Sequence, residues 1–128
     1  MIALLPQPFV TTVMVQNPDV RIALDVTEEW QKINPDTSLI TGCVVLRDAY
    51  ASENGDKVAS FLKDYQASVT SVNEDPAAAS LLIEKYGIIA KAAIAQKAIP
   101  LSNITLITGD EMQKLVEGYL TVLNAADP

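Results

Sequence analysis

Histidine is absent from the 128 residues, and cysteine occurs only once, as Cys43. Histidine is the commonest general base and the commonest transition-metal ligand, so both kinds of site lose their usual side chain. A single cysteine excludes an internal disulfide and a zinc site built from several thiolates. We expect Cys43 to be a buried small hydrophobe, because it lies in the apolar run Leu39–Leu46.

The sequence also contains no phosphate-binding loop, no nucleophile elbow and no metal-ligand spacing. Asp25, Glu28 and Glu29 form the one carboxylate cluster that could serve acid–base work or bind Mg²⁺. Capping at the start of a helix explains the same three residues without chemistry, and we favour that interpretation. The sequence therefore predicts a protein that is not an enzyme and needs neither cofactor nor metal.

Cations are scarce: nine Lys and Arg face sixteen Asp and Glu, which gives a net charge of −7. A phosphate-binding surface needs clustered cations, so nucleic acid is not an expected partner. No apolar stretch reaches the roughly 18 residues of a membrane span. The N-terminal residues lack a basic region, and prolines interrupt their apolar run, so no secretory signal is recognised.

Hydrophobic residues make up 49% of the chain and charged residues 20%, which favours a packed globule over disorder. Four apolar runs are typical of β-strands: Ile2–Leu5, Val20–Val26, Leu39–Leu46 and Ile104–Ile107. The first begins one residue from Met1, so its partner strand must come from later in the chain or from other residues.

Helices are predicted between these runs. Phe9–Gln16 is expected to be a short helix after Pro8, and Thr27–Trp30 a capped turn. A long helix begins at about Asn54, because apolar residues recur every three or four positions. Its stripe consists of Val58, Phe61, Leu62, Tyr65, Val69 and Val72.

Three further helices are expected in the second half. Asp75 is the predicted N-cap of a helix that ends at Gly87, and a shorter helix covers Ala90–Ala98 before Pro100. Thr108 and Glu111 have capping-box spacing at the start of the last helix. The predicted buried face of this last helix consists of Met112, Leu115, Val116, Tyr119, Leu120 and Leu123.

Together these elements predict an α/β fold, with a three- to four-stranded sheet and about four main helices. So small a sheet would leave at least one edge apolar and unpaired. The generous helical stripes and the short sheet are both typical of part of a larger α/β lobe.

The order of motifs resembles the C-terminal part of solute-binding proteins of ABC importers. The similarity is to the nitrate, sulfonate, taurine and thiamine-precursor group, which has the type II periplasmic-binding-protein fold. The segments that carry the resemblance are LLPQPFVT, PDVRIALDVTEEW, TGCVVLRD, VASFLKDYQASVTSVNEDPAAASLLIEKYGI and AIPLSNITLITGDEMQKLVEGYL.

The resemblance implies a single, incomplete α/β lobe over residues 1–128. Residues 1–12 correspond to a crossover or hinge, and residues 13–128 to the C-terminal portion of lobe one. The complete relatives are periplasmic or lipid-anchored outside the cytoplasm. They capture a small organic anion or pyrimidine-like ligand and deliver it to an ABC permease.

The implied ligand-binding residues lie in two places. They are Gln7, Pro8, Phe9 and Thr11 near the crossover, and Thr41 and Gly42 at the start of the strand Leu39–Leu46. A structural alternative remains for each group. The prolines would only shape a hinge while Phe9 packs in the core, and Gly42 would relieve crowding between a helix and the sheet.

Two other function classes stay open. The chain is an interaction or oligomerisation module without a ligand of its own, in which Ile2–Leu5 and the following helix are exchanged between copies as a homo-oligomer forms. Alternatively, it is the effector-sensing domain of a regulator, although no basic helix-turn-helix segment is present.

Overall fold

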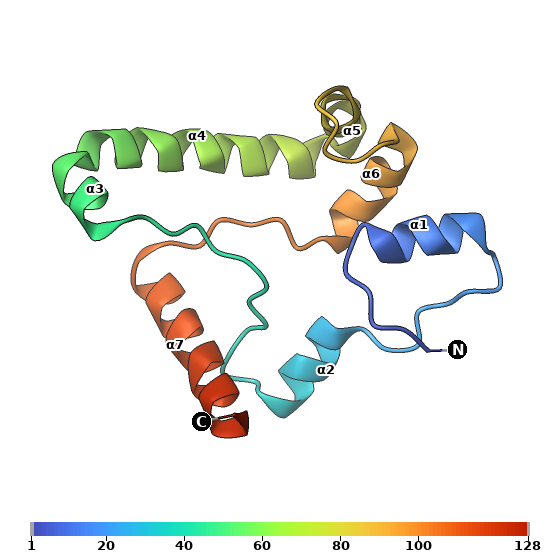
Figure 1. Ribbon diagram of the computed structural model, residues 1–128, viewed down its shortest axis with the longest axis horizontal. Coiled ribbons are helices and arrows are strands. Elements are labelled where there is room, and N and C mark those ends of the chain that lie inside the picture. The colour runs from blue at the N-terminus through green and yellow to red at the C-terminus, as the bar shows by residue number, and fades with distance from the viewer. Residues whose placement is uncertain (1, 128) are drawn as a thin grey trace. The chain divides into compact units, whose positions relative to one another are not determined.

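The computed structural model describes residues 2–127, and every regular element in that range is helical (Figure 1). The α-helices are α1 Phe9–Gln16, α2 Val26–Ile33, α3 Asp48–Glu53, α4 Gly55–Glu74, α5 Pro76–Lys85, α6 Ala92–Ala98 and α7 Gly109–Ala126; a short 3₁₀-helix, η1, covers Ile99–Leu101.

The predicted α/β fold is therefore wrong. No β-ladder forms between described residues, and the runs expected as strands, Ile2–Leu5, Leu39–Leu46 and Ile104–Ile107, carry no regular structure. The remaining run, Val20–Val26, is not a strand either, because its last residue, Val26, begins α2. An apolar, β-branched run becomes a strand only where a second strand lies within hydrogen-bonding reach. Among the described residues, none of these runs forms such a ladder.

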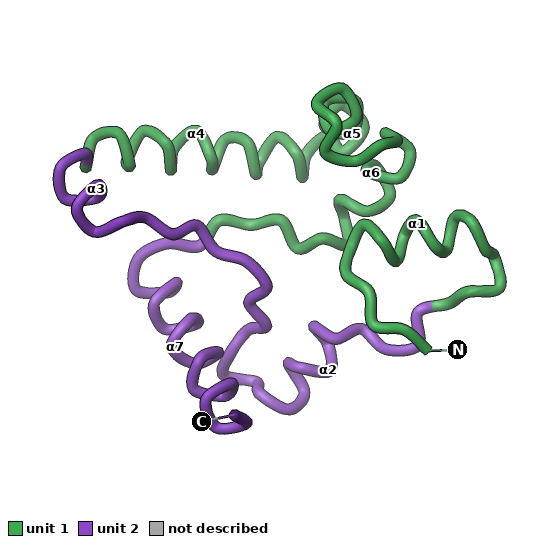
Figure 2. Tube along the Cα trace, viewed as in Figure 1, with its two compact units in different colours: residues 1–21, 55–106 green, residues 22–54, 107–128 purple. Residues whose placement is uncertain are grey.

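The chain divides into two compact units, shown in Figure 2. Unit 1 consists of residues 1–21 and 55–106, and unit 2 consists of residues 22–54 and 107–128. Each unit therefore combines segments that are distant in the sequence.

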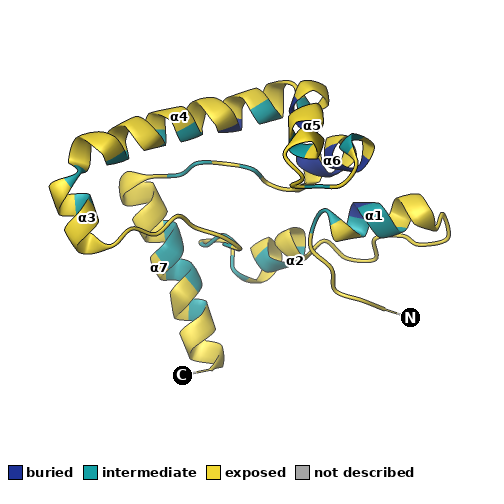
Figure 3. Ribbon diagram, turned by 45° about the horizontal axis from the view of Figure 1, so that its top comes forward, coloured by how far each residue is buried: buried dark blue, intermediate teal, exposed yellow. Residues whose placement is uncertain are grey.

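Unit 1 is organised around α6. Helices α5 and α1 both pack on it, and α4 packs against α5 and η1. The buried apolar residues come from these elements (Figure 3), and half of them are alanine, which lets helix backbones approach closely. They are Val69, Ala79, Ile94, Ala95, Ala98 and Ile99. Ala95, with no exposed surface, lies at the centre of this core.

Local signals define the ends of α5 as predicted. The Asp75 carboxylate accepts a hydrogen bond from the Ala78 N–H at 2.9 Å, and Pro76 occupies the first helical position. Gly87 follows the helix with φ +68°, the left-handed conformation that glycine adopts readily. The next residue, Ile88, donates its N–H to the carbonyl of Ile83, which closes the last turn.

In unit 2, the predicted acidic cap lies at the start of α2. One carboxylate oxygen of Asp25 accepts the N–H groups of Thr27 and Glu28, at 2.8 and 3.2 Å. The capping interpretation of this acidic cluster is therefore confirmed. On the exposed side of the helix, Glu29 accepts a hydrogen bond from Lys32 at 2.6 Å, and this bond raises the pKa of the lysine.

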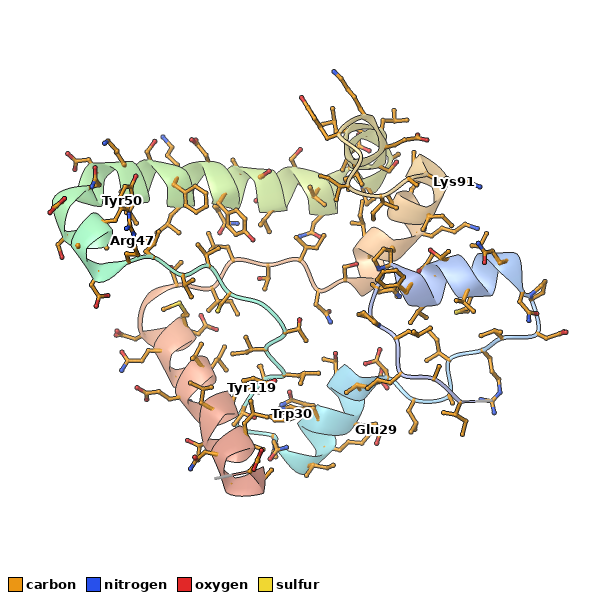
Figure 4. All side chains as sticks on the ribbon, viewed as in Figure 1. Glu29, Trp30, Arg47, Tyr50, Lys91 and Tyr119 are labelled. Atoms are coloured by element: carbon orange, nitrogen blue, oxygen red, sulfur yellow. The ribbon has the colours of Figure 1, made fainter. Side chains whose placement is uncertain are left out.

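Trp30 organises the contact between α2, the following loop and α7. Its indole Nε1 donates to the Thr37 hydroxyl at 2.9 Å, and its ring lies 5.2 Å from the Tyr119 ring, tilted by 50° (Figure 4). Gly118 makes this approach possible, because a Cβ at that position would lie 2.8 Å from Cγ2 of Thr37. Trp30 thus anchors α2 to the following loop and to α7.

Two predictions for α7 are wrong. The Thr108 side chain makes no capping hydrogen bond, because Gly109, with φ +66°, turns the chain into the helix. The predicted face is at most half-buried. Leu115, Val116 and Tyr119 are partly covered, whereas Met112, Leu120 and Leu123 are exposed.

We predict that Gly118→Ala destabilises unit 2 by about 1 kcal/mol. The added methyl group collides with Cγ2 of Thr37, and crowding of this kind costs about 1–3 kcal/mol. The better helix propensity of alanine offsets only about 0.5–1 kcal/mol of that cost. Urea unfolding followed by the fluorescence of Trp30, the single tryptophan, measures the difference.

Thr37→Ser is the matched background for this substitution. Serine keeps the hydroxyl that Trp30 bonds but lacks Cγ2, so Gly118→Ala should there become neutral or stabilising. Equal destabilisation in both backgrounds would contradict the proposed collision.

Candidate functional site

A groove of about 500 Å³ lies in unit 1, between α1 and the segment that leads into α6. This volume is in the range of small-molecule sites. The lining is mostly apolar: from α1 and its approach it includes Pro8, Phe9, Thr12 and Val15, and from the other side Ile88, Ile89, Ala93 and Ile94.

The α1 side of the groove is built by local hydrogen bonds. The carbonyl of Pro6 accepts the N–H groups of Phe9 and Val10, which starts the helix. The side-chain oxygen of Gln7 accepts the Thr11 hydroxyl at 2.7 Å, and Thr11 is only 6% exposed. The first turn is therefore held together by its own polar groups.

The opposite side is built by the chain between α5 and α6. Ile88 and Ile89 follow the left-handed Gly87, and Lys91 immediately precedes α6, where Figure 4 labels it. Lys91 is the one charged residue among the described residues that line the groove. An apolar groove with a single ammonium group is chemically suited to a small molecule that has an apolar body and an anionic end.

The structure places four of the predicted ligand-binding residues together at the start of α1. Pro8 and Phe9 line the groove, while Gln7 and Thr11 bond to one another. Phe9 is 60% exposed, so the alternative in which it packs in the core is wrong. A ligand-binding role for these residues stays a prediction.

Thr41 and Gly42, the other two predicted residues, belong to unit 2 and are exposed. A Cβ at Gly42 would meet no atom within 4 Å, so the crowding interpretation is wrong. Every residue from Thr41 to Tyr50 is exposed, including Cys43, which was expected to be buried. The missing sheet explains this difference, because nothing in unit 2 covers the run.

Sequence reasoning missed Lys91 and Ile88. A usable signal was present: two isoleucines and a lysine follow a helix-ending glycine directly, where a loop normally carries polar residues. Their contact with α1 could not be read from the sequence, because some 70 residues separate the two sides of the groove.

Uncovered apolar side chains are the other prominent surface feature. Leu4 is 81% exposed and Val45 80% exposed, and neither lies in a helix. Other exposed apolar residues outside the helices include Ile2, Val20, Ile22, Leu24, Val44 and Leu46. These side chains are accessible to other molecules.

Within residues 2–127, no group of His, Cys, Asp and Glu is arranged to hold a metal ion. No helix in that range is both long and apolar enough to span a bilayer. Comparison with known proteins finds no matching family model, no matching curated protein and no matching solved structure. The groove and the uncovered apolar runs are therefore the features from which a function is argued.

We predict that Thr11→Val destabilises unit 1 by about 1 kcal/mol, because it removes the hydroxyl donor from the partly buried oxygen of Gln7. Urea unfolding monitored by far-ultraviolet circular dichroism gives this difference. After this substitution the Gln7 oxygen keeps only a long hydrogen bond, from the Thr11 N–H at 3.4 Å. Thr12→Val is the control: its hydroxyl donates to the carbonyl of Pro8 at 3.0 Å, but that carbonyl keeps the shorter bond from the Thr12 N–H at 2.9 Å. A similar loss in both variants would contradict the role of Gln7.

Proposed function

We propose that this chain is a non-catalytic interaction module, which works by burying its uncovered apolar segments against further polypeptide. The observation that carries the proposal is the exposure of large apolar residues in the segments 2–5, 20–24 and 44–46, outside any helix. Each large apolar side chain left in water forgoes about 1.5–3 kcal/mol that full burial would contribute.

Charge acts against non-specific association. At a net charge of −7 the copies repel one another, and salt screens this repulsion. An interface formed by uncharged apolar segments should consequently strengthen as the salt concentration rises. An interface formed by ion pairs should weaken.

We predict that the mass measured by light scattering after size exclusion exceeds 13.8 kDa at high micromolar concentration and increases with added NaCl. The triple variant Leu4→Ser, Leu24→Ser, Val45→Ser removes apolar area from all three segments without changing the net charge. It should lower the associated fraction at least about tenfold, since the loss of buried apolar area costs several kcal/mol.

The matched control replaces three exposed serines of α4, in Ser60→Ala, Ser68→Ala, Ser71→Ala, and should associate like the parent chain. A parent chain that remains monomeric at high micromolar concentration, with or without salt, would refute the interaction module.

A second candidate function is the capture of a small organic anion or pyrimidine-like solute, as in the solute-binding components of ABC importers. The groove favours it, because Pro8 and Phe9 of the motif LLPQPF line it together with Lys91. The sheet that this resemblance implies is not formed by the described chain, so the candidate stands on the groove and the motifs alone.

We predict for this candidate that an alkyl sulfonate or a substituted pyrimidine raises the Tm in a thermal-shift panel, because a ligand bound only to the folded state stabilises it. Lys91→Gln should abolish the shift produced by the sulfonate. Lys97→Gln, which removes an exposed lysine of α6 that does not line the groove, should retain it. Absence of any shift with the parent chain at millimolar concentrations would exclude the candidate.

A further inference from the structure

Residues 38–46 of unit 2 have no hydrogen-bonding arrangement of their own. Among the described residues, no backbone N–H or C=O of this segment has a hydrogen-bond partner, and none of its residues is helical. The segment is bounded by Thr37, whose hydroxyl Trp30 holds, and by α3, which begins at Asp48. Its ends are therefore anchored while its backbone is free to pair.

The composition of the segment favours a β-strand. Ile40, Thr41, Val44 and Val45 are all β-branched, a class of residue enriched in strands. The ten residues 37–46 contain no charged side chain, although the chain as a whole carries −7. Two copies can therefore bring this segment together without bringing like charges together within it.

If the chain associates with itself, a second copy can supply the missing backbone partners of this segment. Resting on the interaction module proposed above, we infer that residues 39–47 pair with the same residues of a second copy, as an antiparallel ribbon in which Cys43 faces Cys43. A strand that pairs with itself across a two-fold axis forms an isologous contact, which closes as a dimer.

Side-chain alternation limits the registers in which two copies of the segment can pair. In a symmetric antiparallel pair, residues that face each other must point to the same side of the ribbon. With Cys43 opposite itself, Ile40 faces Leu46 and Gly42 faces Val44. The neighbouring symmetric registers match the segment less well. With Gly42 opposite itself, the apolar Leu46 faces the polar Ser38, and with Val44 opposite itself, Ile40 would face Asp48, which belongs to α3.

This register produces one wholly apolar face. Ile40, Val44 and Leu46 of each copy point to the same side, and Gly42 leaves room for the facing Val44. Val44 and Leu46 are exposed in the single chain. A second copy thus supplies both the missing backbone partners and an apolar surface, from one self-complementary segment.

Cys43 gives a direct test, because it is the single cysteine and is exposed. Facing residues in an antiparallel pair have Cα atoms about 4.5–5.5 Å apart, within the range of about 4.4–6.8 Å that a disulfide spans. Diamide, which oxidises two thiols to a disulfide, should therefore cross-link the full chain into a dimer on a non-reducing gel.

The control moves the thiol by one strand period, in the double variant Cys43→Ser, Val45→Cys. Both positions are exposed, but in the proposed register the relocated thiols lie about 13 Å apart along the strands. The parent chain should cross-link at least about tenfold faster than this variant at the same concentration. Equal rates would overturn the register.

A second pair of variants tests the segment without relying on the thiol. Val44→Lys places a cation on the apolar face and should raise the dissociation constant measured by light scattering at least about tenfold. Leu81→Lys makes the same charge change at an exposed position of α5 and should leave the constant unchanged.

The outcomes separate this inference from the proposal on which it rests. Association that persists unchanged in Val44→Lys overturns the pairing of residues 39–47 but leaves the interaction module standing. A parent chain that stays monomeric at every concentration overturns both. Association lost in Val44→Lys alone, together with selective cross-linking through Cys43, supports both.

Discussion

The requirement that backbone N–H and C=O groups find partners underlies the whole structure. An α-helix satisfies this requirement within one segment, whereas a strand depends on another segment placed beside it. The described chain meets the requirement locally, through helices, caps and turns. The apolar runs that would need a neighbour, such as 39–46, are left without one.

The two units show how little packing supports these helices. In unit 1 the core is formed by small residues around α6, with Ala95 at its centre. In unit 2 the hydroxyl of Thr37 and the ring of Tyr119 converge on Trp30, and Gly118 provides the space. Many large apolar side chains are exposed in both units. Burial by a second copy is consistent with this shared deficit.

The candidate site shows where sequence reasoning succeeds and where it ends. Pro8 and Phe9 were predicted from the crossover that the resemblance to solute-binding proteins implies, and they do line the groove. Lys91 and Ile88 complete the same groove but are distant in sequence, and only the packing of α1 on α6 brings them near. Thr41 and Gly42 were predicted together with the first group, yet they belong to unit 2.

Short-range interactions were determined by the sequence alone. Asp25 and Asp75 cap their helices, and Gly87 ends α5, because each acts on backbone groups within four residues of itself. Tertiary structure decided whether the apolar runs form strands and whether Cys43 is buried. Whether such a residue is buried depends on what the rest of the chain places against it. An apolar pattern shows that burial of the segment would be favourable, but it does not show which other segment packs on it.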